Sequence, residues 1–143
     1  MKAYADMSGS QRAMESVEKA SEVFLSHHLF KRKADGEVMD KHFIRIAYPP
    51  YWHYDILAGL RVMAEVGCLS DPRCDDALDL LESRRLPGGG FNADIKYYKV
   101  VDAPREGTGY SFVDWGGTSK NKLNEWVTVT ALSLLKRSGR KTY

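Results

Sequence analysis

Apolar residues recur at three- and four-residue intervals in four stretches of the chain, which is the spacing of helices that bury one face. The boundaries of these stretches carry residues that typically start or stop helices. Ser8 with Gln11 forms a capping-box pattern, and Gly67 and Gly139 follow the second and fourth stretches. Ser70 or Asp71 can cap the third stretch, and Pro72 stands in its first turn. The pattern predicts helices over about residues 9–30, 53–67, 72–86 and 121–137, and it predicts that Leu81 of the third helix is a core residue.

The segment 92–122 separates the third and fourth predicted helices and has a different character. Its parts 95–102 and 110–115 are rich in Tyr, Val and Phe, and turn-forming residues fill the stretch between them. This composition favours a small β-hairpin in the loop.

The two halves of the chain also repeat each other. Phe24 and Leu25 align with Leu80 and Leu81 at an offset of 56 residues. At an offset of 72, the aligned pairs are Tyr54 with Trp126, Leu57 with Val129, Leu60 with Leu132 and Gly67 with Gly139. The offsets differ by 16 residues, which indicates an insertion of that length in the second loop. The sequence therefore predicts one mainly α-helical domain, 1–143, built from two αα-hairpin repeats over about 9–67 and 71–139.

A further spacing in the second half carries a family resemblance. The residues concerned are Ala77, Leu80, Leu81, Arg85, Gly89 and Phe91. They resemble the QW-type repeat of the squalene cyclase (terpenoid cyclase) and protein prenyltransferase superfamily, with Arg85 where glutamine is usual. The resemblance implies outer helices at 9–30 and 72–86 and inner helices at 53–67 and 121–138, as in part of an α/α toroid around an apolar cavity. Because two hairpins leave repeat faces uncovered, we expect a homo-oligomer or part of a longer repeat protein.

The residues that carry the chemistry of this superfamily are not matched. Its proton-donating cyclases use a D-x-D-D sequence, whereas residues 71–76 read DPRCDD and lie on a predicted outer helix. Its protein prenyltransferases bind zinc through an aspartate, the cysteine of a D-x-C sequence and a distant histidine, and this chain contains no Asp-x-Cys. We therefore expect no metal, no cofactor and no catalysis of the kind known from the superfamily.

The start of the second predicted helix holds the best candidates for a functional site. His53 and Asp55 stand among aromatic residues there, and helix N-termini favour anionic groups. Since the 72-residue offset makes Tyr54 and Trp126 equivalent, we expect Trp52, Tyr54 and Trp126 to form the wall of one apolar pocket. The alternative is a capped helix start whose aromatic residues pack in the core. Asp40 is a further candidate acid.

Composition and charge narrow the classes of function. The hydrophobic share of 43% and the charged share of 28% are typical of soluble folded proteins. The net charge is +2 and the basic residues are spread along most of the chain, which argues against nucleic acid as a partner. Cys68 and Cys74 are too few for a disulfide framework and suit reduced thiols in the cytoplasm. No apolar stretch reaches membrane-spanning length.

Three hypotheses of function follow from these observations. The first is a non-catalytic helical repeat protein that binds an apolar, isoprenoid- or lipid-like small molecule or a protein partner. The second is a divergent terpenoid cyclase or prenyltransferase fragment acting on an isoprenoid substrate, with Asp55 or Asp40 as its acid. The third is a scaffold that only contacts other proteins, as many α-helical repeat arrays do.

Overall fold

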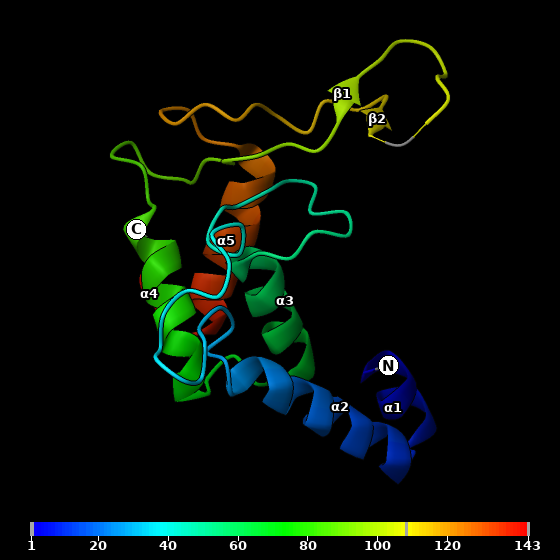
Figure 1. Cartoon of the computed structure of the whole chain (residues 1–143), viewed down its shortest axis with the longest axis vertical. Coiled ribbons are helices and arrows are strands. Elements are labelled where there is room, and N and C mark those ends of the chain that lie inside the picture. The colour runs from blue at the N-terminus through cyan, green and yellow to red at the C-terminus, as the bar shows by residue number, and fades with distance from the viewer. Residues whose placement is uncertain (1, 108, 143) are drawn as a thin grey trace.

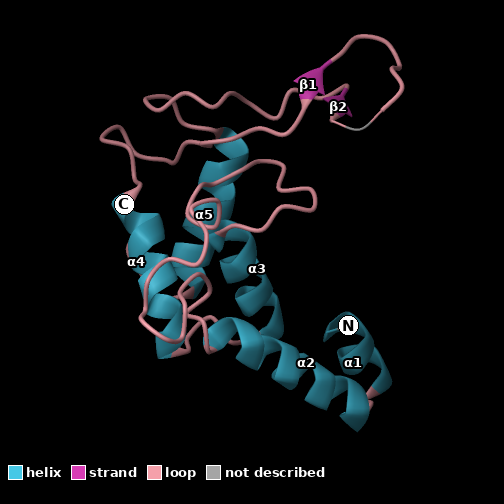
Figure 2. Cartoon of the chain, viewed as in Figure 1, coloured by secondary structure: helices cyan, strands magenta, loops and turns pink. Residues whose placement is uncertain are grey.

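The computed structural model describes residues 2–107 and 109–142, and within them the chain is mainly helical (Figures 1 and 2). Five α-helices and one 3-10 turn are present in this described part. They are α1 (Lys2–Ser8), α2 (Gln11–Leu25), α3 (Ile56–Val66), the 3-10 turn η1 (Pro72–Cys74), α4 (Asp75–Ser83) and α5 (Glu125–Arg137). None of these helices is of a length and apolarity that would let it cross a membrane.

The first predicted helix, 9–30, corresponds to α2 and is shorter than expected, and α1 before it was not predicted. Gly9 adopts a left-handed conformation with φ of +61°, and Ser10 rather than the predicted Ser8 caps α2 by accepting a hydrogen bond from the Ala13 N–H. At its other end α2 stops at Leu25 rather than near residue 30. The chain turns there, with Leu29 at a φ of 69°, and the Leu29 side chain packs in the core.

The glycine stops and the polar start of the third helix were predicted correctly. Gly67 ends α3 in the left-handed conformation, and Gly139 adopts the same conformation after α5. Asp71 accepts a hydrogen bond from the Arg73 N–H and so caps the turn that leads into α4. The starts of α3 and α5 lie a few residues later than expected because Asp55 and Asn124 are their N-caps.

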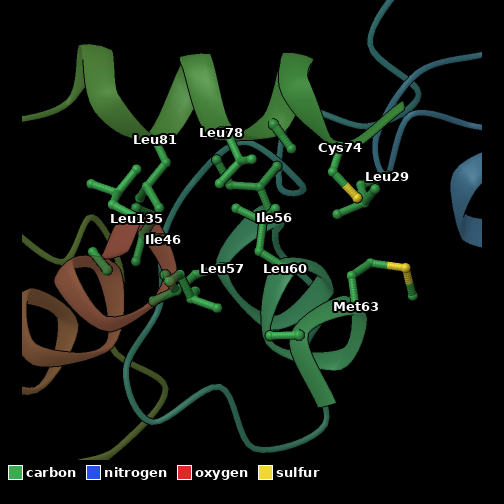
Figure 3. Packing of buried hydrophobic residues seen from close by; sticks show 14 of the residues in the cluster. Leu29, Ile46, Ile56, Leu57, Leu60, Met63, Cys74, Leu78, Leu81 and Leu135 are labelled. Atoms are coloured by element: carbon green, nitrogen blue, oxygen red, sulfur yellow. The ribbon is translucent and has the colours of Figure 1, made fainter. Parts of the chain in front are cut away.

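The core is built around α3, which packs against α2, α4 and α5. Leu78 and Leu81 of α4 point toward Ile56 and Leu60 of α3, and Leu135 of α5 joins them (Figure 3). All five side chains are buried, so the prediction that Leu81 is a core residue is confirmed.

The QW-like spacing acts as a packing motif in the structure. Ala77, Leu81 and Phe91 are fully buried, and Gly89 makes the reversal between α4 and Phe91 with a φ of 82°. The Arg85 guanidinium lies 5.3 Å from the centroid of the Phe91 ring, so the residue at the glutamine position covers the aromatic ring that closes the turn.

The long second loop holds a two-stranded sheet, but it is not the predicted hairpin. β1 (Lys99–Val100) pairs with β2 (Tyr110–Ser111) in parallel, with Lys99 opposite Tyr110. A hairpin requires antiparallel strands joined by a tight turn, whereas β1 and β2 run in the same direction. The sheet lies at the end of the molecule opposite to α1 (Figure 1).

Candidate ligand-binding cleft

Asp55 has a structural position at the start of α3. Its Oδ1 accepts a hydrogen bond from the Ala58 N–H and its Oδ2 accepts one from the Ala47 N–H, both at 2.8 Å. The side chain is buried, and burial raises the pKa of its carboxyl group although the backbone N–H groups oppose that rise. Both oxygens are therefore directed at the backbone, where they join the preceding segment to α3.

His53 lies two residues earlier and has a different environment. Its ring stacks on Tyr97 with 3.4 Å between centroids and 1° between planes, and the Trp52 ring meets it edge-on at 4.6 Å. Within the described residues, the buried Nδ1 of His53 has no hydrogen-bond partner. A buried ring nitrogen without a partner is uncommon in folded proteins, because burial without a hydrogen bond costs free energy.

These rings form one side of a cleft of about 750 Å³, which we call the aromatic cleft. Its lining comes from the segment before α3 and from the long second loop, and consists of Tyr51, Trp52, His53, Tyr97, Gly107, Gly109 and Tyr110. Trp52 is 72% exposed although it is large and apolar. The volume lies in the range of small-molecule sites, and five of the lining residues carry aromatic rings.

A smaller and more polar groove of about 290 Å³ adjoins the aromatic cleft, and we call it the basic groove. It is lined by Lys96, Tyr97, Tyr98, Lys99, Gly109 and Tyr110. Three of these residues, Tyr97, Gly109 and Tyr110, also line the aromatic cleft. The two cavities therefore share a wall, with aromatic rings on one side and two lysines on the other.

The structure does not bring Trp52, Tyr54 and Trp126 into one wall. The Tyr54 hydroxyl donates to the Leu29 carbonyl at 2.7 Å, which directs this side chain toward the core. Trp126 stacks on Tyr48 with 5.9 Å between centroids, and neither Tyr54 nor Trp126 is among the described residues that line the aromatic cleft. The 72-residue offset did not predict the environments of these two side chains, because Tyr54 precedes the N-cap of α3, whereas Trp126 follows the N-cap of α5.

Asp40, the third candidate acid, lies on an exposed loop and not in the lining of the cleft. Its Oδ1 accepts a hydrogen bond from the His42 N–H and lies 2.8 Å from His42 Nδ1. The backbone bond and then the imidazole contact lower the pKa of its carboxyl group. A carboxyl group with a lowered pKa is ionised at neutral pH and makes a poor proton donor.

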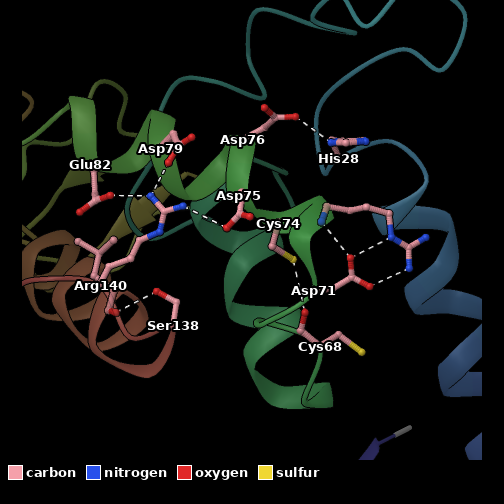
Figure 4. A network of polar contacts seen from close by, with 12 residues as sticks. His28, Cys68, Asp71, Cys74, Asp75, Asp76, Asp79, Glu82, Ser138 and Arg140 are labelled. Atoms are coloured by element: carbon pink, nitrogen blue, oxygen red, sulfur yellow. Dashed lines mark hydrogen bonds and ion pairs between the residues drawn. The ribbon is translucent and has the colours of Figure 1, made fainter.

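The acidic face of α4 is paired with other parts of the chain rather than free in solvent (Figure 4). Arg140, in the tail after α5, forms ion pairs with Asp75, Asp79 and Glu82. On the same helix, Asp76 lies 2.8 Å from both the Lys31 ammonium and the His28 ring nitrogen. The aspartates around residues 71–79 thus tie helix α4 to the tail and to the loop after α2.

Sequence reasoning missed the part of the cleft that comes from the second loop. Tyr97 and Tyr110 lie in a segment for which the composition predicted only strands. The available signal was the run Lys96-Tyr97-Tyr98-Lys99, which places two aromatic residues between two lysines in a loop. Which of those rings faces the segment before α3 depends on tertiary packing.

Comparison of the chain with family models, with curated proteins and with solved structures gave no match. The resemblance to the terpenoid cyclase and prenyltransferase superfamily therefore stays a prediction from the sequence. Among the described residues, no three His, Cys, Asp or Glu side chains gather as a metal-binding group.

Proposed function

We propose that this chain binds an apolar small molecule in the aromatic cleft. The observation that carries the proposal is a cleft of about 750 Å³ whose lining includes the rings of Trp52, His53, Tyr97 and Tyr110, with Trp52 72% exposed. Apolar walls with few, well-placed polar groups are the usual composition of small-molecule sites. The wall comes from two separate segments, and each contributes aromatic rings.

The ligand that fits this chemistry has an extended apolar body and one hydrogen-bonding group. Aromatic rings offer large apolar contact areas, and Trp52 is exposed enough to lie along such a body. His53 supplies the polar contact, since a neutral imidazole nitrogen either donates or accepts according to its tautomer. An isoprenoid- or lipid-like molecule has this composition.

Binding is favoured over turnover by the positions of the candidate acids. A divergent cyclase or prenyltransferase would need Asp55 or Asp40 to deliver a proton to its substrate. Both oxygens of Asp55 accept backbone hydrogen bonds, and the pKa of Asp40 is lowered by its contacts with His42. Neither carboxyl group is presented to the aromatic cleft as a free acid.

The test is calorimetric titration of the full chain with farnesol, an isoprenoid alcohol. Trp52→Ala should weaken binding about tenfold, or about 1.4 kcal/mol, because it removes a large aromatic contact from the site. Trp126→Ala is the matched control, since the same truncation is made outside the aromatic cleft, and it should change the affinity less than about twofold. Equal losses in both variants, or no binding by the unaltered chain, would refute the proposal.

We also infer that the two helix pairs, α2 with α3 and α4 with α5, are repeat units of an α/α toroid, and that a further helical hairpin covers the outer face of α5. Trp126 and Val129 are three residues apart on this face and are 44% and 69% exposed. In solution the cover would be a second copy of the chain. Val129→Glu should shift sedimentation toward the monomer, whereas Val23→Glu, the same change at a valine of α2 that is 61% exposed, should not. A monomer at all concentrations would refute self-association.

A further inference from the structure

The basic groove adds a second chemical character to the aromatic cleft. Lys96 and Lys99 line the groove, and its remaining wall is shared with the cleft through Tyr97, Gly109 and Tyr110. A ligand that lies along the aromatic rings can therefore reach two ammonium groups without crossing a barrier of other residues.

The backbone around the two lysines is held in place by buried contacts. Tyr98 lies between them and is buried, and its hydroxyl accepts a hydrogen bond from the Trp115 N–H at 2.8 Å. The Lys99 N–H donates to the Gly109 carbonyl at 2.7 Å, which ties β1 to the opposite side of the groove. The positions from which the two lysine side chains extend are thus determined by the packing of the loop.

The two lysines are not paired with acidic side chains of the described residues. In the described part of the chain, neither Lys96 nor Lys99 forms an ion pair, whereas Arg140 and Arg84 both do. Lys96 Nζ lies 5.4 Å from the centroid of the Tyr98 ring, so its ammonium is kept beside the groove. An anionic group would complement this pair of charges.

We infer, resting on the proposed function, that the cleft and the groove together bind an amphipathic carboxylate such as a fatty acid. Its apolar chain lies along Trp52 and Tyr110, and its carboxylate meets Lys96 and Lys99. A carboxylate is complementary to these two ammonium groups in charge and in hydrogen bonding. Because the lysines are exposed, the carboxylate should add a preference of about three- to tenfold rather than most of the affinity.

The experiment compares dodecanoate with dodecanol, two ligands that share one alkyl chain and differ in the head group. Calorimetric titration of the full chain should show about three- to tenfold tighter binding of dodecanoate at about 0.01 M salt. That preference should shrink at about 0.1 M salt, where the Debye length has fallen from about 30 Å to about 10 Å.

Substitution of the lysines identifies the source of the preference. Lys96→Gln with Lys99→Gln should remove the preference for dodecanoate and leave the affinity for dodecanol unchanged. Lys120→Gln with Lys122→Gln is the matched control, because it removes the same charge at exposed positions outside the groove lining and should keep the preference.

The outcomes separate this inference from the proposed function. Equal affinities for the two ligands, or a preference that survives in the Lys96 and Lys99 variant, would refute the carboxylate inference while apolar binding stands. Binding of neither ligand by the unaltered chain would refute both.

Discussion

Replacing Gly59 by alanine should destabilise the protein, although the helix alone would favour the substitution. Gly59 lies inside α3 and is buried. Glycine in a helix interior is about 1 kcal/mol less favourable than alanine, so a site with free space would gain about that amount. The packing around Gly59 reverses the sign of the expected change in stability.

A Cβ atom at position 59 would meet the side chain of Tyr54. It would lie less than 3.0 Å from the Tyr54 hydroxyl oxygen, 3.1 Å from Tyr54 Cζ and 3.2 Å from Leu29 Cδ2. Tyr54 cannot withdraw freely, because its hydroxyl donates to the Leu29 carbonyl and its ring packs edge-on against Phe43 at 4.9 Å. Overpacking typically costs about 1–3 kcal/mol, and a lost hydrogen bond about 1 kcal/mol. After the helix gain is subtracted, we expect a net loss of about 1–3 kcal/mol.

Urea unfolding followed by circular dichroism measures this loss as a lower midpoint at an unchanged slope. Tyr54→Phe alone should cost about 1 kcal/mol through the lost hydrogen bond. In the Gly59→Ala background it should cost less, because it also removes the oxygen nearest to the new methyl group, and the coupling should be about 0.5–3 kcal/mol. Ala20→Gly, at an exposed position of α2, reports the helix propensity term by itself.

A higher midpoint for Gly59→Ala than for the unaltered chain would refute this reasoning. It would mean that Tyr54 does not pack against α3, and that the side chain could instead face a ligand as the sequence pattern suggested. A coupling of zero between positions 54 and 59 would lead to the same conclusion.

Three further predictions concern the core, the thiols and one carboxyl group. Leu81→Ala should lower the free energy of unfolding by about 2–5 kcal/mol in the same urea assay, since Leu81 of α4 is fully buried against α3. A change under about 0.5 kcal/mol would contradict that position. Alkylation at neutral pH followed by mass spectrometry should label Cys68 and spare Cys74, because burial raises the pKa of the Cys74 thiol to about 11. Prompt labelling of both cysteines would contradict the burial of Cys74. Asp71 should titrate by NMR with a pKa of about 2, because the Arg73 side chain and then its backbone N–H donate to the carboxylate, and Arg73→Gln should raise that pKa. This depressed pKa contributes stability above about pH 4 that is lost as the pH falls toward 2, so an ordinary pKa in the unaltered chain would contradict it.

Helix positions could be predicted from the sequence because their causes are local. The spacing of apolar residues placed Leu81 in the core. Gly67 and Gly139 follow the ends of their helices in the left-handed conformation, which glycine adopts without steric cost. The cap at Asp71 was also readable, since an N-cap bonds to a backbone group only a few residues away. Such features depend on neighbours within about one helical turn.

The candidate site was predicted only in part, because its formation depends on contacts between distant segments. Trp52 and His53 were identified from the chain alone, but Tyr97 reached them only through the path of the second loop. The sequence suggested Asp55 as a candidate acid, but in the structure its Oδ2 accepts a hydrogen bond from the Ala47 N–H. Local patterns cannot specify which group a side chain meets across the fold.

The sequence by itself determined the approximate positions of α2, α3, α4 and α5 and which of their faces are apolar, since hydrogen bonding and side-chain periodicity act within a few residues. The tertiary structure alone decided that Tyr54 packs inward while Trp126 stacks on Tyr48, although one offset makes them equivalent. It also decided that β1 and β2 run in parallel, a direction that the strand-like composition of 95–102 and 110–115 does not specify. The physical reason is the same in both cases: packing partners are chosen by three-dimensional proximity, which neither spacing nor composition encodes.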